Sequence, residues 1–168
     1  MRKKPLASED LSIAELVELI RRRSKLPVVG CTEEVVREIC ALAPGPLPSD
    51  YLEWLRLAGD HPGDFMLGTD IAAPFIPDMQ EAMRKTSREL GGPAFPADAF
   101  VFADHQAYVY LWFHARGDLD RRIFRFLQMD RRWTEVSPSF TAYMNWSARD
   151  DYGLKPPPWR SEQGAARG

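Results

Sequence analysis

Histidines that stand beside carboxylates are the first residues to test for chemistry. His61 lies between Asp60 and Asp64, and His105 directly follows Asp104. Imidazole and carboxylate groups are common ligands of transition metals, so either cluster is a candidate ligand set. Neither cluster has a second histidine at i+2 or i+4, which would make a metal motif specific. A small metal-dependent hydrolase built on these groups is therefore the weakest of three functional hypotheses.

Other signatures of catalysis or cofactor binding do not emerge from the sequence. A phosphate-binding loop needs glycines that open a helix with Lys and Ser or Thr, but Gly91 and Gly92 are followed by Pro93. Cys31 and Cys40 have neither the number nor the spacing of a disulfide framework or a zinc knuckle. We expect Cys40 to be a buried core residue. The sequence thus predicts no enzyme, no metal and no cofactor.

Length and charge restrict the remaining classes. The chain has 168 residues, a formal net charge of -2 and a pI near 5.9. This length suits one domain, and the absence of a positive field disfavours binding to nucleic acid. No apolar run approaches the length of a membrane span, and acids interrupt the stretch after the basic start at residues 2–4. We therefore expect a cytoplasmic protein with neither a nucleic-acid nor a membrane partner.

The densest aromatic and β-branched runs lie between residues 100 and 127, and the rest of the chain must be organised around them. They predict three consecutive strands, with a polar turn at 104–107 between the first two. Tyr110 and Trp112 alternate with Leu111 and Phe113, so the middle strand is expected to be covered on both faces. The predicted strands are residues 100–103, 108–113 and 123–127, with short further strands at 65–67 and 132–136.

Apolar residues at helical spacing predict helices packed against this sheet. Ser12 and Glu15 have the spacing of a capping box, and Thr32 is expected to cap the next helix. Gly59 suits a left-handed residue that ends the third helix, and Ser137 with Pro138 is expected to start the last one. The buried stripes are Ile13, Leu16, Val17 and Ile20; Val35, Val36, Ile39, Cys40 and Ala43; Tyr51, Trp54, Leu55 and Ala58; Met79, Ala82, Met83, Thr86 and Leu90; and Phe140, Tyr143 and Met144.

These elements define the expected architecture. It is an α+β fold in which a mainly antiparallel sheet is flanked by helices. Residues 11–154 form the single domain. Residues 1–10 are expected to be a flexible N-terminus, and residues 155–168 a flexible tail that contains prolines. The basic run at 21–23 is interpreted as a solvated helix end that complements the helix dipole.

Three motifs in order resemble the SUKH superfamily, which includes yeast cell-wall regulators (Smi/Knr-like) and the bacterial Syd protein. Residues 47–55, LPSDYLEWL, resemble its Leu-Pro-x-x-Tyr-x-x-x-Leu helix entry. Residues 100–113 resemble its pair of strands joined by an acidic turn. Residues 137–143, SPSFTAY, are similar to the Ser-Phe-x-x-Tyr start of its last helix. The match covers residues 32–150, although Ala58 replaces the family's usual asparagine before Gly59.

This resemblance implies a SUKH-like fold that acts by binding protein. Bacterial members are predominantly immunity proteins that neutralise a polymorphic toxin, often a nuclease, so acids that complement a basic toxin are the candidate contacts. The alternative is a housekeeping regulator or scaffold of the same fold that binds an endogenous partner through an aromatic groove. The oligomeric state stays open. The candidate partner-binding residues are Asp60, Asp64, Asp104, Asp118, Asp120 and Trp112.

Overall fold

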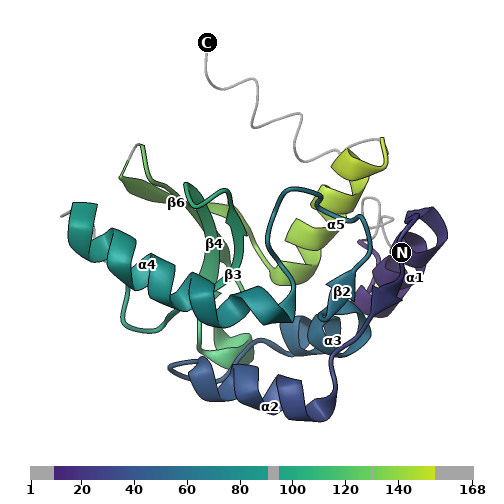
Figure 1. Ribbon diagram of the computed structural model, residues 1–168, viewed down its shortest axis with the longest axis horizontal. Helices are drawn as coiled ribbons and strands as arrows, with labels where there is room; N and C mark the ends of the chain where they lie inside the picture. The colour runs from purple at the N-terminus through teal and green to yellow at the C-terminus, as the bar shows by residue number, and fades with distance from the viewer. Residues whose placement is uncertain (1–9, 91–94, 130, 154–168) are drawn as a thin grey trace, which may run out of the picture.

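The structure of this chain, a computed structural model, describes residues 10–90, 95–129 and 131–153 (Figure 1). Its helices are α1 (Ile13–Arg23), α2 (Glu33–Leu42), α3 (Ser49–Ala58), α4 (Ile76–Leu90) and α5 (Phe140–Asp151), with 3-10 turns η1 (Ala73–Phe75) and η2 (Gly117–Leu119). Its strands are β1 (Val28–Val29), β2 (His61–Pro62), β3 (Ala99–His105), β4 (Val109–His114), β5 (Ile123–Leu127) and β6 (Arg132–Ser137). The predicted α+β class is confirmed. The predicted flexible ends, except residue 10, and the predicted helix stop at 91–93 lie outside the described residues.

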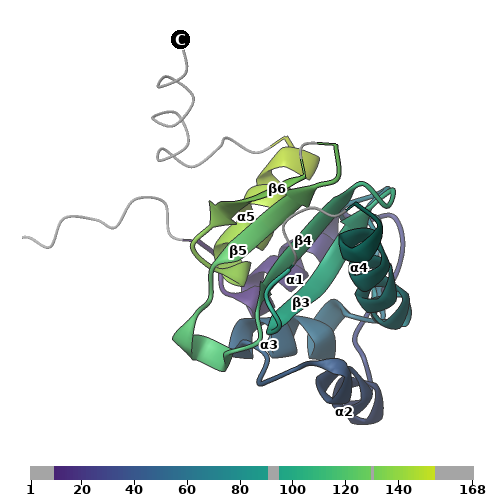
Figure 2. The same cartoon turned by 90° about the vertical axis from the view of Figure 1, so that its left-hand side faces the viewer.

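The four long strands form one antiparallel sheet in the order β3-β4-β5-β6, while β1 and β2 form a separate two-stranded ribbon. Figure 2 shows α4 beside β3 in front of the sheet, whereas α1, α3 and α5 lie behind it. We call the face toward α3 and α5 the inner face and the opposite one the outer face. The sheet therefore has helical cover on its inner face and partial cover, from α4, on its outer face.

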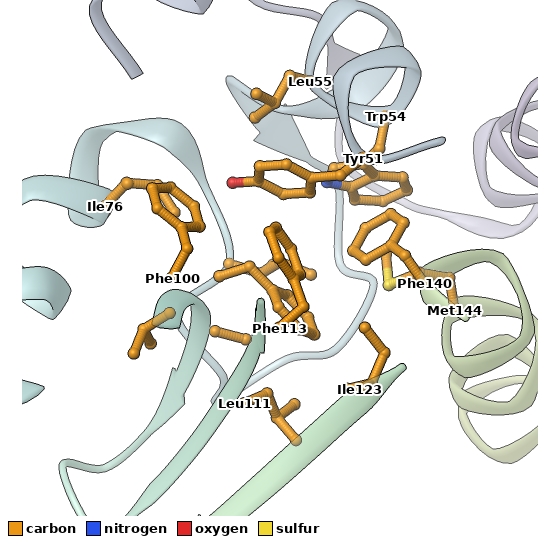
Figure 3. Packing of buried hydrophobic residues seen from close by; sticks show 14 of the residues in the cluster. Tyr51, Trp54, Leu55, Ile76, Phe100, Leu111, Phe113, Ile123, Phe140 and Met144 are labelled. Carbon is orange, nitrogen blue, oxygen red and sulfur yellow. The ribbon is translucent and has the colours of Figure 1, made fainter. Parts of the chain in front are cut away.

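Buried side chains of α3, α5 and the inner face pack together in the core (Figure 3). The Tyr51 ring lies 5.2 Å from the rings of Phe113 and Phe140, edge to face in both cases. Trp54 and Phe100 are also fully buried. Each large apolar side chain removed from water contributes about 2 kcal/mol to folding. These rings fix the position of α3 on the sheet.

Strand β4 is buried on both faces, as its sequence predicts. Leu111 and Phe113 face the inner core, while Tyr110 and Trp112 pack on the outer face against Phe95. None of these four side chains, which are the central ones of the six in β4, is more than 5% exposed. The side-chain alternation that a strand imposes therefore carries two packed layers.

Two predicted helix starts are confirmed. Ser12 and Glu15 form a reciprocal capping box, with bonds of 3.3 and 2.8 Å. The Thr32 side chain accepts a hydrogen bond from the backbone N–H of Val35 at 3.3 Å. Just ahead of α1, Leu11 exchanges two hydrogen bonds with the Asn145 side chain of α5, which ties the start of the domain to its last helix.

The hairpin between β3 and β4 begins later than predicted. The predicted turn at 104–107 is confirmed only at Gln106 and Ala107, because β3 continues through His105, which pairs with Val109. Gln106 and Ala107 take left-handed backbone angles, with φ of 52° and 60°, and make the reversal. The carboxylate of Asp104 accepts a bond from the Ala107 N–H at 2.8 Å, so the acid supports the turn from inside the strand.

The predicted strand at 65–67 is wrong, and the segment is a turn. Met66 has a φ of 54°, and its N–H donates to the Asp151 carboxylate at 2.6 Å. Phe65 packs on Trp54 and Tyr152 instead of extending the sheet. An apolar triplet cannot by itself distinguish a strand from a turn that buries one large ring.

The predicted burial of Cys40 is also wrong. Val36 and Ile39 are buried on α2, but Cys40 is exposed. Helix α2 packs against the domain only along the narrow strip that contains Val36 and Ile39. Cys40, the residue after Ile39, lies outside this strip and faces solvent.

One predicted helix end and one predicted helix start form in a different way from the one expected. Gly59 is not left-handed, since its φ is -70°. A side chain there would instead place Cβ 2.6 Å from Leu55 Cα and 3.0 Å from Cys31 Sγ, so close approach requires the glycine. Helix α5 is capped by Ser139, whose hydroxyl accepts from the Ala142 N–H, and not by Ser137.

Candidate partner-binding surface

Asp118 has a structural role at the start of α3. Its carboxylate accepts hydrogen bonds from both the backbone N–H and the hydroxyl of Ser49, each at 2.9 Å. Pro48 at the N-cap provides no side-chain bond, so a carboxylate from η2 caps the helix. The Ser49 N–H, with help from Arg121, lowers the pKa of Asp118. Its position is explained by the fold and does not need a partner.

Asp64 and Asp104 also have partners within the chain. The Asp64 carboxylate accepts from the backbone N–H of Lys25 at 3.0 Å, and this bond lowers its pKa. Asp104 is partly buried, which raises its pKa, and the nearby Asp70 adds to the rise. Both acids thus support local chain geometry, in a loop and in a hairpin respectively.

The remaining predicted contacts have different positions and exposures. Asp60 is exposed just beyond the end of α3, whereas Asp118 lies at its start, about 15 Å away along a ten-residue helix. Asp120 follows η2 and is bonded to Arg122. Trp112 is fully buried, so its side chain is not available for contact and we remove it from the set. The six residues therefore do not form one surface.

The structure does bring Asp120 toward an aromatic cluster on the outer face. Phe124 of β5 stacks on Trp112 with ring centroids 4.6 Å apart. Trp133 of β6 meets both rings edge-on, at 5.6 Å from Trp112 and 5.5 Å from Phe124. Trp112 forms the floor of the cluster, while Trp133 is 39% exposed. An exposed indole on a rigid aromatic base is a typical protein-binding feature.

Charged groups frame this cluster. The Arg122 guanidinium lies 5.4 Å above the centre of the Phe124 ring, a cation-π contact. It binds both carboxylate oxygens of Asp120, at 2.9 and 2.8 Å, and reaches Glu135 at 3.5 Å. The Arg122 bonds lower the pKa of Asp120. We define the outer-sheet patch as Asp120, Arg122, Phe124, Trp133 and Glu135.

A histidine and a carboxylate pair at the end of β4 beside the patch. His114 Nδ1 lies 2.8 Å from Asp98, which also binds Arg116 at 2.5 Å. Burial opposes ionisation of Asp98, but the bonds from His114 and Arg116 outweigh it, so its pKa is lowered. The His114 ring contacts Phe124 edge-on at 5.4 Å. This pair fixes the histidine ring against the aromatic cluster.

The histidines that suggested metal ligands make other contacts. His61 Nδ1 lies 2.9 Å from the carbonyl oxygen of Pro27, and His105 Nδ1 lies 3.0 Å from the Thr69 hydroxyl. Within residues 10–90, 95–129 and 131–153, no three His, Cys, Asp or Glu side chains gather as a metal site. The same part of the chain has no helix with the length and apolarity of a membrane span.

Sequence reasoning missed four of the five patch residues. Phe124 comes from β5, Trp133 and Glu135 come from β6, and Arg122 directly precedes β5. Nothing in either run alone shows that they meet. The alternation of Trp133 and Glu135 on a predicted strand does indicate a shared face. Their pairing with β5, Phe126 opposite Trp133 and Phe124 opposite Glu135, completes the surface.

A concave surface that is separate from the outer-sheet patch lies between α2 and α4. It includes a cavity of about 600 Å³ whose lining contains Leu42, Met83, Phe95, Arg84 and Arg88. Leu42 is 41% exposed and also borders a smaller cavity of about 220 Å³. An aromatic-lined groove was expected for the housekeeping alternative, but the only aromatic side chain among these five residues is Phe95.

Comparison with known proteins adds no relative: no protein-family model matches this chain, and no curated protein does. The resemblance to the SUKH superfamily therefore depends on the three sequence motifs.

Proposed function

We propose that this chain is a non-catalytic protein-binding domain, and specifically a cytoplasmic immunity protein that neutralises a bacterial toxin by direct binding. The SUKH-like motifs are the reason for the specific part of the proposal. The outer-sheet patch is the observation that carries the general part. A cytoplasmic inhibitor would meet its toxin where the toxin acts.

The patch has the composition of a binding centre. Trp and Arg are the residues most enriched among those that dominate binding energy, and here Trp133 and Arg122 share the Phe124 ring. Trp133 needs little ordering on binding, because two rings already hold it. Binding would cover an indole that is now 39% exposed. The gain comes from burial of that surface on a base that does not rearrange.

The charges of the patch suit a basic partner. Glu135 reaches Arg122 only at 3.5 Å, whereas Asp120 occupies the guanidinium at 2.8 Å. The Glu135 carboxylate is thus the more weakly held of the two acids and can turn toward a lysine or arginine of the toxin. Complementary charge speeds encounter and selects the partner.

Co-expression with the toxin encoded by a neighbouring gene tests this function. The wild-type chain should protect the host cell, and Trp133→Ala or Arg122→Ala should weaken toxin binding by about thirtyfold or more, as expected for a dominant contact. Phe75→Ala is the matched control, because Phe75 is an aromatic residue 46% exposed and lies in η1, outside the patch. Circular dichroism and isothermal titration would separate folding from binding.

The outcomes discriminate between the hypotheses. Lack of protection by the wild-type chain contradicts the immunity function. Protection that is lost in Phe75→Ala but retained in Trp133→Ala moves the interface away from the outer-sheet patch. An endogenous partner that binds through the patch, with no toxin gene nearby, would identify the housekeeping regulator instead.

A further inference from the structure

Strand β6 has one edge that no described strand or side chain pairs with. It ends the sheet, since β5 lies on its only paired side. Arg132, Trp133, Thr134 and Glu135 are all exposed, so the described residues leave both faces of this half of β6 at least partly accessible. An unpaired edge presents a row of backbone donors and acceptors.

The register identifies the backbone groups that point outward. Across an antiparallel sheet, residues alternate between bonding to one neighbour and to the other. The backbone N–H and C=O groups of Val101 point away from β4, because both bond to the Gln80 side chain. The opposite residue, Trp112, therefore points its own N–H and C=O groups toward β5. Trp112 pairs with Phe124, which therefore bonds toward β4 and away from β6.

The same alternation continues to the last strand. Phe124 lies opposite Glu135, and Phe126 lies opposite Trp133. Because Phe124 and Phe126 bond to β4, the N–H and C=O groups of Trp133 and Glu135 point to the open edge. Each of these residues offers one donor and one acceptor to an incoming strand. Their side chains both project from the outer face, into the patch.

We propose that β6 accepts an extended segment of the partner protein as a fifth strand, an inference that deepens and rests on the proposed binding function. The main-chain bonds of Trp133 and Glu135 would hold the segment, and their side chains would select it. The outer-sheet patch and the open edge are then two parts of one interface.

The patch defines the chemistry of the incoming strand. Opposite Trp133 we expect an apolar β-branched or aromatic side chain, which would pack on the exposed indole. Opposite Glu135, two residues along the same face, we expect lysine or arginine. A segment with the pattern apolar-x-basic, in either direction, meets both requirements.

A second copy of this chain would complement the side chains at the β6 edge less well than a basic segment does. Two-fold antiparallel pairing about Thr134 would place Trp133 opposite Glu135 and Arg132 opposite Val136, which forms no charge pair. Pairing about Trp133 would need Arg131 in the strand, but Arg131 has a φ of 51°. A basic segment from a different protein gives the better charge complementarity.

Capped synthetic strands test the edge without the toxin. The probes are acetylated, amidated Thr-Val-Thr-Lys-Thr and its reverse, Thr-Lys-Thr-Val-Thr, added at millimolar concentration to the ¹⁵N-labelled full chain. Binding should slow hydrogen exchange at the amides of Trp133 and Glu135 at least tenfold. In Thr-Lys-Thr-Val-Thr, the probe that would pair antiparallel, N-methylation of Val and Lys should abolish the effect. N-methylation of its Thr residues should not, because their N–H groups would face away from β6.

A matched pair of variants tests the same edge from the protein side. Glu135→Pro removes the outward N–H as well as the charge, and proline is tolerated at a sheet edge. Glu135→Gln removes the charge alone. Probe binding should be weaker in Glu135→Pro than in Glu135→Gln, with the sheet intact by circular dichroism.

Specific results would overturn the inference. These are no protection of Trp133 and Glu135 by either probe, equal binding of both N-methylated forms, or protection that appears without probe and rises with protein concentration, which would assign the edge to a second copy. Because no toxin is present, failure here leaves the proposed function untouched. Failure to neutralise a toxin would in turn leave strand binding measurable.

Discussion

The two edges of the four-stranded sheet differ in whether their backbone groups have hydrogen-bond partners. At the β3 edge, the buried Gln80 side chain of α4 donates to the Val101 carbonyl at 2.6 Å and accepts from its N–H at 3.2 Å. Farther along, Asp70 and Asp104 exchange backbone bonds of 2.8 and 2.9 Å. At the β6 edge, residues 132–135 are exposed and have no such partner among the described residues.

This difference indicates which edge of the sheet is already bonded within the chain and which edge can still pair with a strand of another protein. A glutamine amide has the donor and acceptor of a peptide group, so Gln80 replaces one residue of a neighbouring strand. The β3 edge therefore cannot accept another chain without losing α4. The β6 edge needs no rearrangement to pair, and charged residues there limit unspecific association.

Amide hydrogen exchange of the free protein gives the largest expected contrast. The Val101 amide is bonded to a buried side chain and should exchange only when the sheet opens. The amides of Trp133 and Glu135 should exchange about a thousandfold faster, equivalent to about 4 kcal/mol. Thr134 is the internal control, because its N–H points to β5. Equal protection of Trp133, Thr134 and Glu135 would show that the β6 edge is already covered.

Substitution of Gln80 should destabilise the closed edge. Gln80→Met keeps much of the volume but leaves the buried N–H and C=O of Val101 without partners. The expected loss is about 3 kcal/mol in the free energy of unfolding, measured in urea. Thr134→Ala, at the open edge, should change it by less than about 0.5 kcal/mol. Comparable values for the two variants would refute the contrast between the edges.

Acid titration of Asp104 gives the smallest effect. Burial raises its pKa in the folded state above the unfolded value of about 3.8, so the stability this group provides is lost as pH rises through the folded pKa. Asp104→Asn should therefore be slightly more stable at pH 7, by on the order of 0.5 kcal/mol after allowance for solvent screening. The difference should vanish below the unfolded pKa. Thermal unfolding from pH 3 to 7 checks this, and a less stable variant at pH 7 would contradict it.

Much of the secondary structure followed from local sequence. The capping box at Ser12, the cap at Thr32 and the alternation through β4 each depend on residues a few positions apart. The errors lie where a distant group intervenes. Asp151 bonds to Met66 and keeps that segment a turn, and the packing of α2 on one narrow strip leaves Cys40 in solvent.

The candidate surface depended far more on tertiary structure. The sequence indicated that acids are plentiful in loops, but not that Asp118 caps α3 or that Asp120 is occupied by Arg122. Nor does it show that Trp112 is buried while Trp133 is exposed, since both are tryptophans on strands. Exposure of a strand residue depends on what covers its face, and that cover comes from other parts of the chain.

The sequence by itself determined the α+β class, most of the helices and the strands of the main sheet, because periodicity and capping act between near neighbours. Only the tertiary structure decided that Gln80 closes β3, that no described strand pairs with the outer edge of β6, and that Arg122, Phe124, Trp133 and Glu135 share one face. These features come from strand register and from helix placement. Both are set by contacts between residues far apart in the sequence, which no local pattern records.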